Sequence, residues 1–205
     1  MSEAKKSKIL TAARSGFLRF GYKRISMTDI AEAAGVSRPA LYLLFKNKEE
    51  IFIGVFMQWL NETIAACKSE MEKCGTSEQK LMCAFEIWAV HPFEMMMRSP
   101  EAKELIECSF GFAQDSIKQG YKIFEAAIVP VVASLAGRNP AKAHMAPEKI
   151  VHVLASAVRG FKQTAAKPAE LRLLIEELLV LSFSLDHDAI RRHVRIRQDA
   201  GSRSR

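Results

Sequence analysis

Apolar side chains recur every three or four positions along most of this sequence, which is the spacing of one face of an α-helix. The first such stretch places Ile9, Ala13 and Phe17 on one face and ends at Gly21, a residue type that commonly terminates helices. No stretch shows the sustained alternation of apolar and polar residues that a half-buried strand requires. The pattern predicts an all-α protein.

Two short helices follow, joined by a glycine-containing turn of about four residues. Ser26, followed three residues later by an aspartate, has the capping-box pattern, and Ser37 precedes the second helix as an N-cap. Leu41 and Phe45 are four residues apart in the second helix and therefore share its buried face. The arrangement predicts a helix-turn-helix over about residues 26–45.

The other face of the second helix is expected to carry Arg38, Pro39, Ala40 and Leu44. Ala40 is small enough to permit close approach to the floor of a DNA groove. Arg38 has the planar, forked group that matches a guanine edge or a phosphate. This face is typical of a helix that reads duplex DNA.

Asn47 offers an N-cap for a long helix that reaches about Cys74. Pro130 is expected to kink or end the helix that contains it. Further helices are predicted at about 77–90, 92–98, 100–112, 114–136, 148–165 and 168–185. Few apolar residues follow, and residues 186–205 are expected to form a mobile tail.

The formal net charge of +7 is unevenly distributed. Residues 1–50 hold 10 Lys/Arg against 5 Asp/Glu, a net charge of +5. Residues 51–185 hold 14 against 15, a net charge of −1, and residues 186–205 hold 6 against 3, a net charge of +3. A basic N-terminal segment ahead of a nearly neutral one is expected of a phosphate-binding module joined to a different domain.

Several other classes of protein are disfavoured by the sequence. The N-terminal residues lack the apolar segment of a secretory signal, and the most apolar later run, 126–136, is roughly half a bilayer span. Cys67, Cys74, Cys83 and Cys108 show no paired CxxC spacing. We therefore expect a cytoplasmic protein with reduced thiols, no membrane segment, no metal and no cofactor.

Apolar, glycine, capping and charged positions fall into one register over about residues 7–55. They are Ile9-Leu10-x-Ala12-Ala13, Phe17, Phe20-Gly21-Tyr22-x-x-Ile25-Ser26-Met27-x-Asp29-Ile30-Ala31, Ala34-Gly35-Val36-Ser37-x-x-x-Leu41-Tyr42-x-x-Phe45 and Asn47-Lys48-Glu49-Glu50-Ile51-Phe52. In this register the segment, about a quarter of the chain, resembles the N-terminal domain of the TetR family of bacterial transcriptional regulators.

The resemblance implies a helical homodimer that binds an operator palindrome through its N-terminal domains and a small effector through its C-terminal domain. Effector binding would change the separation of the two DNA-binding domains and release the DNA. By resemblance only, repression is favoured over activation. The implied division of the chain is a DNA-binding domain over 1–50, an effector-binding and dimerisation domain over 51–185 and the basic tail over 186–205.

The resemblance, together with the basic charge of the N-terminal segment, assigns DNA contact to a set of residues on and around the helix-turn-helix. They are Thr28, Ser37, Arg38, Pro39, Ala40, Tyr42, Lys46 and Lys48. Two positions depart from the family pattern: Ile25 replaces a threonine that offers a backbone contact, and Leu44 stands where a histidine or tyrosine often touches phosphate. A thymine-methyl contact by Leu44 is a further hypothesis.

Large flexible and aromatic side chains are frequent in the C-terminal domain, as suits an adaptable apolar cavity. The expected pocket residues are Met82, Phe85, Glu86, Trp88, His91, Phe110, Gln114 and Tyr121. The alternative for each apolar member is ordinary core packing. A buried, ionised Glu86 would need a cationic partner and would favour a basic amphipathic ligand.

The last two helices carry apolar residues on more than one side and therefore must be covered on more than one side. We predict a four-helix dimer interface, with burial within one chain as the alternative. The interface residues are Leu154, Val158, Phe161, Leu174, Leu178 and Leu181.

Three alternative functions remain open. Cys67 and Cys74 are seven residues apart and would share a helix face, which suggests a thiol-based redox sensor whose thiol pKa the neighbouring Lys68 and Lys73 would depress. Buried, inert cysteines are the alternative. A helical-bundle enzyme has poor support because no nucleophile and base set, metal cluster or phosphate loop is evident. The third alternative makes the C-terminal domain a platform for a protein partner.

Overall fold

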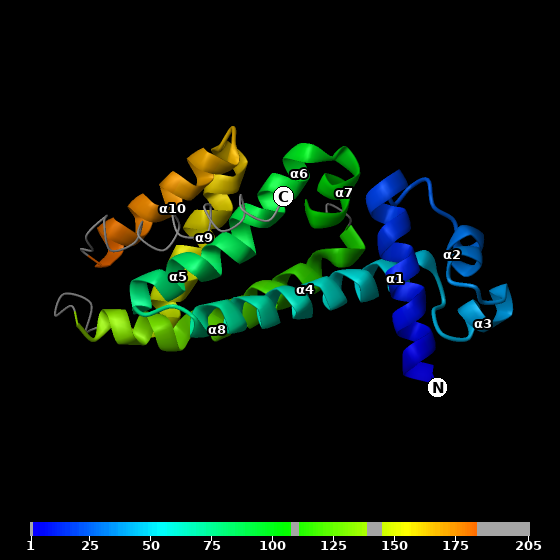
Figure 1. The fold of residues 1–205 in the computed structure, drawn as a ribbon, viewed down its shortest axis with the longest axis horizontal. Coiled ribbons are helices and arrows are strands. Elements are labelled where there is room, and N and C mark those ends of the chain that lie inside the picture. The colour runs from blue at the N-terminus through cyan, green and yellow to red at the C-terminus, as the bar shows by residue number, and fades with distance from the viewer. Residues whose placement is uncertain (1, 108–110, 139–144, 184–205) are drawn as a thin grey trace. The chain divides into compact units, whose positions relative to one another are not determined.

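The computed structural model describes residues 2–107, 111–138 and 145–183, and every regular element in those ranges is a helix (Figure 1). The predicted all-α fold class is confirmed. Cys108, Phe110 and the predicted tail over 186–205 lie outside the described residues.

The described residues form two compact units. The first unit comprises residues up to Glu62 together with Met95–Gly120, and the second comprises Thr63–Glu94 together with the described residues from Tyr121 onward. Residues 95–120 thus pack with the N-terminal helices, which a division at residue 50 does not anticipate. The functional division at that residue stays a prediction.

The first unit is built around α1 (Ser2–Phe20), which packs against α2 (Met27–Ala33) and α7 (Pro100–Glu107). It also includes α3 (Arg38–Tyr42), the first part of α4 (Lys48–Glu72), the short η2 (Gly111–Ala113) and the start of α8 (Gln114–Ala136). Its core is aromatic. The ring of Tyr22 meets that of Phe52 with centroids 5.0 Å apart, and Phe52 meets Phe112 at 5.6 Å.

The helix ends in this unit follow the chemistry that the sequence predicts. Gly21 ends α1 with a φ of 85°, and its N–H donates to the Phe17 carbonyl at 2.9 Å. The capping box of α2 is complete, because the Ser26 N–H donates to the Asp29 carboxylate at 2.8 Å and the Asp29 N–H donates to the Ser26 hydroxyl at 3.2 Å. The Ser26 hydroxyl also donates to that carboxylate at 2.7 Å, and this hydrogen bond, followed by the one from the Ser26 N–H, lowers the pKa of Asp29.

The turn between α2 and α3 depends on Gly35. The Val36 N–H donates to the Ala31 carbonyl at 2.9 Å and the Gly35 N–H donates to the Glu32 carbonyl at 3.0 Å. This is the Schellman pattern, which requires a left-handed residue after the helix, and Gly35 supplies it with a φ of 62°. The turn therefore directs the chain from α2 into α3 without unpaired N–H groups at these two positions.

The second unit contains α5 (Ser77–Phe85), α9 (Pro147–Thr164) and α10 (Pro168–Phe183), and α10 packs against both α5 and α9. It also contains the π-helical turn η1 (Glu86–Val90), most of α8, and the parts of α4 and of α6 (His91–Arg98) that lie within Thr63–Glu94. The helices α9 and α10 begin at Pro147 and Pro168, close to the starts predicted at about 148 and 168, and proline suits the first position of a helix.

The structure adds two details to the predicted helices. The segment 77–90 is an α-helix only as far as Phe85 and then widens into the π-helical turn η1, which carries Glu86 and Trp88. Pro130 lies inside α8 and does not end it, because the helix continues to Ala136. The kink expected at Pro130 stays a prediction.

We predict that Gly35→Ala destabilises the protein by about 1–2 kcal/mol, because a Cβ is disfavoured at positive φ. The cost is conformational, since the Lys8 ammonium would lie 3.5 Å from the added Cβ, an ordinary contact. The measurement is the free energy of unfolding from denaturant titration. Gly16→Ala, within α1 and with a nearest contact of 3.5 Å to Ile25, is the control and should be neutral or stabilising. Equal effects of the two substitutions would contradict the prediction.

Candidate DNA-binding surface

The helix α3 is anchored along one face and presents the other to solvent. Its N-cap is Ser37, whose hydroxyl accepts a hydrogen bond from the Ala40 N–H at 3.3 Å. Leu41 is fully buried, whereas Arg38 and Pro39 are exposed and Tyr42 keeps 45% of its surface exposed. Anchoring by a few buried residues thus leaves the other side chains of α3 available for an external partner.

The structure brings most of the predicted DNA-contact residues together on or beside α3. Ala40 is half-buried on that helix, Lys46 is exposed just after it, and Thr28 is exposed in the first turn of α2. The helices α2 and α3 pack against each other within the first unit (Figure 1). Ser37 also has a structural role, because its hydroxyl caps α3.

Lys48 lies at the start of α4 and is bound within the protein. Its ammonium donates to the main-chain carbonyls of Tyr22 and Ile25, both at 2.9 Å, and lies 4.2 Å from the centroid of the Tyr22 ring. Lys48 therefore fixes the start of α4 to the segment that precedes α2. Lys48 thus positions the helix-turn-helix. This structural role differs from the phosphate contact that was predicted for it.

The expectation that Leu44 faces outward is wrong. Leu44 is half-buried and packs against the core of the first unit, whereas the neighbouring Leu43 is 86% exposed. At about 100° per residue, position 43 lies opposite the mean direction of the buried Leu41 and Phe45, and position 44 lies beside them. That angular arithmetic is the sequence signal that identifies Leu43.

Sequence reasoning also missed three cations of the first unit. Lys23 and Arg24 are exposed in the turn between α1 and α2. Lys8 is exposed on α1, and its ammonium lies close to the turn at Gly35. The sequence signal for all three was the net charge of +5 of residues 1–50. A net charge does not show which individual lysines and arginines lie near the helix-turn-helix.

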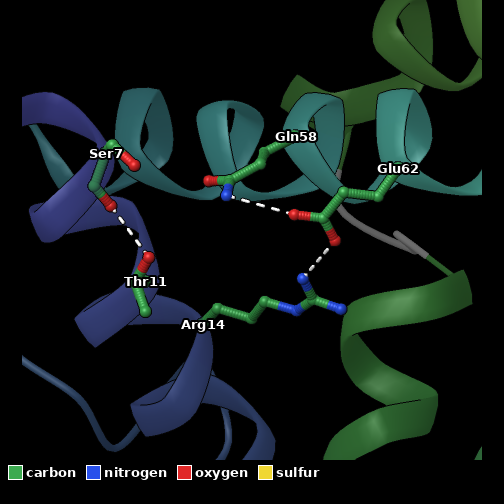
Figure 2. A network of polar contacts seen from close by, with 5 residues as sticks. All are labelled: Ser7, Thr11, Arg14, Gln58 and Glu62. Atoms are coloured by element: carbon green, nitrogen blue, oxygen red, sulfur yellow. Dashed lines mark hydrogen bonds and ion pairs between the residues drawn. The ribbon is translucent and has the colours of Figure 1, made fainter. Parts of the chain in front are cut away.

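A groove of about 650 Å³ in the first unit lies between α1 and α4. Its lining includes the carboxylates of Glu3, Glu50 and Glu62, with Lys6 as the cation. Figure 2 shows one edge of it, where Arg14 of α1 donates to Glu62 of α4 at 2.6 Å and Gln58 donates to the same carboxylate at 3.2 Å. An acidic lining repels phosphate, so the groove is unsuited to DNA.

In the second unit, Glu86 is paired with an internal cation. The Arg172 Nε donates to Glu86 at 2.9 Å, its terminal nitrogen donates to the other carboxylate oxygen, and the His91 Nε2 lies 3.7 Å from Glu86. The hydrogen bonds with Glu86 raise the pKa of Arg172. Because the chain itself supplies the cation, the geometry gives no reason to expect a basic ligand.

Three aromatic side chains and one arginine meet in the second unit. The Trp88 ring stacks on Phe124 with centroids 4.4 Å apart and meets Tyr121 edge-on at 5.5 Å. The Arg159 guanidinium lies 3.8 Å from the centroid of Tyr121. Trp88 and Tyr121, both predicted pocket residues, are therefore brought together in one cluster.

The other predicted pocket residues are dispersed. Met82 and Phe85 are buried in α5 of the second unit, whereas Gln114 is exposed and belongs to the first unit. Phe110 lies outside the described residues. The pocket stays a prediction for the members of the second unit.

The described cysteines are buried. Burial raises the pKa of Cys67 and of Cys83 to about 12, and burial also raises the pKa of Cys74. The thiols therefore stay protonated at neutral pH, which disfavours a thiolate sensor. Within the described residues, no group of three or more His, Cys, Asp or Glu side chains is arranged to hold a metal ion, and no helix is long and apolar enough to span a membrane.

The predicted dimer residues differ in exposure. Leu154 and Val158 of α9 are buried within the chain, Phe161, Leu174 and Leu178 are half-buried, and Leu181 is 79% exposed. The same two helices also expose Val153 and Leu173. The outward apolar surface therefore includes residues that periodicity did not select.

Comparison with known proteins places these observations in a family. Residues 9–55 match the family described as "Bacterial regulatory proteins, tetR family". The chain is 40% identical over 72 residues to the HTH-type transcriptional regulator YhgD of Bacillus subtilis, covering 35% of this chain and 38% of that protein. It is 24% identical over 157 residues to the HTH-type transcriptional activator FasR of Mycolicibacterium smegmatis, covering 76% and 70%.

The fold has a similar counterpart among solved structures. The transcriptional regulator FadR of Bacillus subtilis, in complex with stearoyl-CoA, superposes with a TM-score of 0.61 at 19% identity, covering 85% of this chain and 97% of that one. The fold and the comparisons together define a helical protein with an exposed helix-turn-helix in its N-terminal residues. The chain belongs to the TetR family of bacterial regulatory proteins.

We predict that Lys48→Met lowers the free energy of unfolding by about 1–2 kcal/mol, because two carbonyl acceptors lose a charged donor. Lys46→Met is the matched control, since Lys46 is exposed, and should change stability by less than about 0.5 kcal/mol. Denaturant titration measures both. An unaffected Lys48 variant would show that the interactions of its ammonium do not hold the unit together.

Proposed function

We propose that this protein is a one-component transcriptional regulator, in the first instance a repressor, that binds duplex DNA as a homodimer and is released by a small, largely apolar effector. The exposed face of α3, with Arg38, Pro39 and Tyr42, is the observation that carries the proposal. A short helix anchored on one side and exposed on the other fits the major groove. Flanking cations such as Lys46 suit the phosphates that set its position.

The homodimer is proposed on the outward surface of α9 and α10. Val153, Leu173 and Leu181 expose apolar area there, which pairing with the same helices of a second copy would cover. The buried Leu154 and Val158 support that surface from within the chain. Two copies would then place their α3 helices in successive major grooves of a pseudo-palindrome, about 34–36 Å apart.

The effector is proposed to bind in the second unit, with long-chain acyl-CoA thioesters as the class to test. The support is the likeness to FadR of Bacillus subtilis, which was solved in complex with stearoyl-CoA. The buried Met82 and Phe85 provide apolar packing of the kind an acyl chain needs. Arg159 is an exposed cation in the same unit that suits an anionic headgroup.

We predict that the purified protein binds duplex DNA from the region upstream of its own gene, with two chains per duplex. Arg38→Ala should weaken binding roughly tenfold or more, because a guanidinium contact to a base or phosphate is lost. Affinity should fall steeply with salt, since each neutralised phosphate adds about −0.9 to the log–log slope. Fluorescence anisotropy titrations measure both effects.

Arg138→Ala is the matched control for that experiment, because Arg138 is an exposed arginine of the second unit. It should leave DNA affinity unchanged. Leu181→Glu should yield a folded monomer by sedimentation, with much weaker binding to the palindrome. Absent or salt-insensitive binding of the unaltered protein would overturn the proposed function.

We predict that stearoyl-CoA raises the thermal midpoint of the protein and weakens DNA binding at least tenfold at saturation. A ligand that binds the folded state at 100 times its Kd adds about 2.7 kcal/mol of stability. Free coenzyme A and free stearate are the controls that separate headgroup from acyl chain. If neither DNA affinity nor the midpoint responds to acyl-CoA of any chain length, this effector class is wrong while DNA binding stands.

A further inference from the structure

We infer that Leu43 reads a thymine in each half-site by contact with its C5-methyl group; the inference rests on the proposed function. Leu43 is the C-cap residue of α3, directly after Tyr42. It is 86% exposed, more than the 79% of Leu181 in the proposed dimer surface. A single exposed leucine is ordinary, so the argument depends on where this one lies.

Leu43 lies at the C-terminal end of α3 and, around the helix axis, in the middle of its exposed side. Its N–H donates to the Pro39 carbonyl at 3.0 Å, the helical bond that joins residues one turn apart. Leu43 and Pro39 therefore lie on the same side of the helix, opposite the buried Leu41 and Phe45. An apolar pair thus forms the centre of the surface that the proposed function directs into the groove.

The residues on either side of this pair are polar or small. Arg38 and Tyr42 lie on one side of it, and Ala40 lies on the other. The guanidinium and the phenol can reach phosphates or base edges by hydrogen bonds. The centre is left without a hydrogen-bonding side chain, because neither proline nor leucine carries one.

The chemistry of the major groove then selects the partner. Each base pair presents donors and acceptors there, and the C5-methyl of thymine is the apolar group of the four bases. A leucine placed against a donor or acceptor would leave that group without its water, at a cost in affinity. Placed against a methyl group, it removes apolar area from water on both molecules.

The half-buried Leu44 lacks this access. It packs against the core of the first unit and lines the acidic groove between α1 and α4. The methyl-reading role suggested for Leu44 by sequence position therefore passes to Leu43. The two adjacent leucines have different tasks, one in the fold and one on the DNA.

The test begins with selection of bound duplexes from a random-sequence DNA pool by the full-length protein. Each thymine of the selected palindrome is then replaced by deoxyuridine, which lacks only the methyl group, and Kd is measured by fluorescence anisotropy. At one position per half-site we expect a loss of about fourfold in one half-site and about sixteenfold in both, as for burial of one methyl group. Leu43→Ala should bind thymine and deoxyuridine duplexes within a factor of about 1.5 of each other.

Two further variants make the outcome decisive. Met97→Ala removes another exposed apolar side chain of the first unit and should keep the full sensitivity to deoxyuridine. Leu43→Gln should shift the selected base toward adenine, to which glutamine donates and accepts.

Tolerance of deoxyuridine at every position, or undiminished sensitivity in Leu43→Ala, would overturn this inference while the proposed function stands. A pool that yields no bound duplex would overturn both.

Discussion

Short helices are unstable unless their ends are capped and one face is buried, and this constraint governs the N-terminal unit. The helices α2 and α3 have seven and five residues, well below the length at which an isolated helix persists in water. Ser26 and Ser37 cap their first turns, Gly35 ends the first of them, and Lys48 ties the preceding segment to α4. The exposed face of α3 exists because every one of these local contacts holds the backbone that carries it.

The caps and the glycine turn, which act over a few residues, are also what the sequence could predict. A serine followed by an aspartate three residues on, a glycine after a helix and a proline at a helix start each act within a few residues, so the caps at Ser26 and Ser37 and the start of α9 were identified correctly. The buried Leu41 and Phe45 follow from helical spacing alone. The family resemblance added the reading that this helix-turn-helix meets DNA.

Long-range contacts were beyond the same reasoning. The segment from Phe112 to Ile117 joins the core of the first unit, although nothing in its spacing distinguishes it from the rest of the chain. Arg172 pairs with Glu86 from 86 positions away, and Lys48 reaches main-chain carbonyls, which no side-chain pattern reveals. The error at Leu44 was different, because it came from the helix spacing itself: at about 100° per residue Leu43, and not Leu44, lies opposite the buried Leu41 and Phe45.

The division of labour between adjacent side chains on α3 bears on how such a protein changes in evolution. Leu41 and Phe45 hold the helix, whereas Pro39 and Leu43 contribute little to the core. Substitutions at the outward pair therefore escape the selection that acts on folding. Under the proposed function, a lineage could retarget its binding sequence through single replacements at these positions and keep the same scaffold, so that duplicated genes would diverge in the promoters they control.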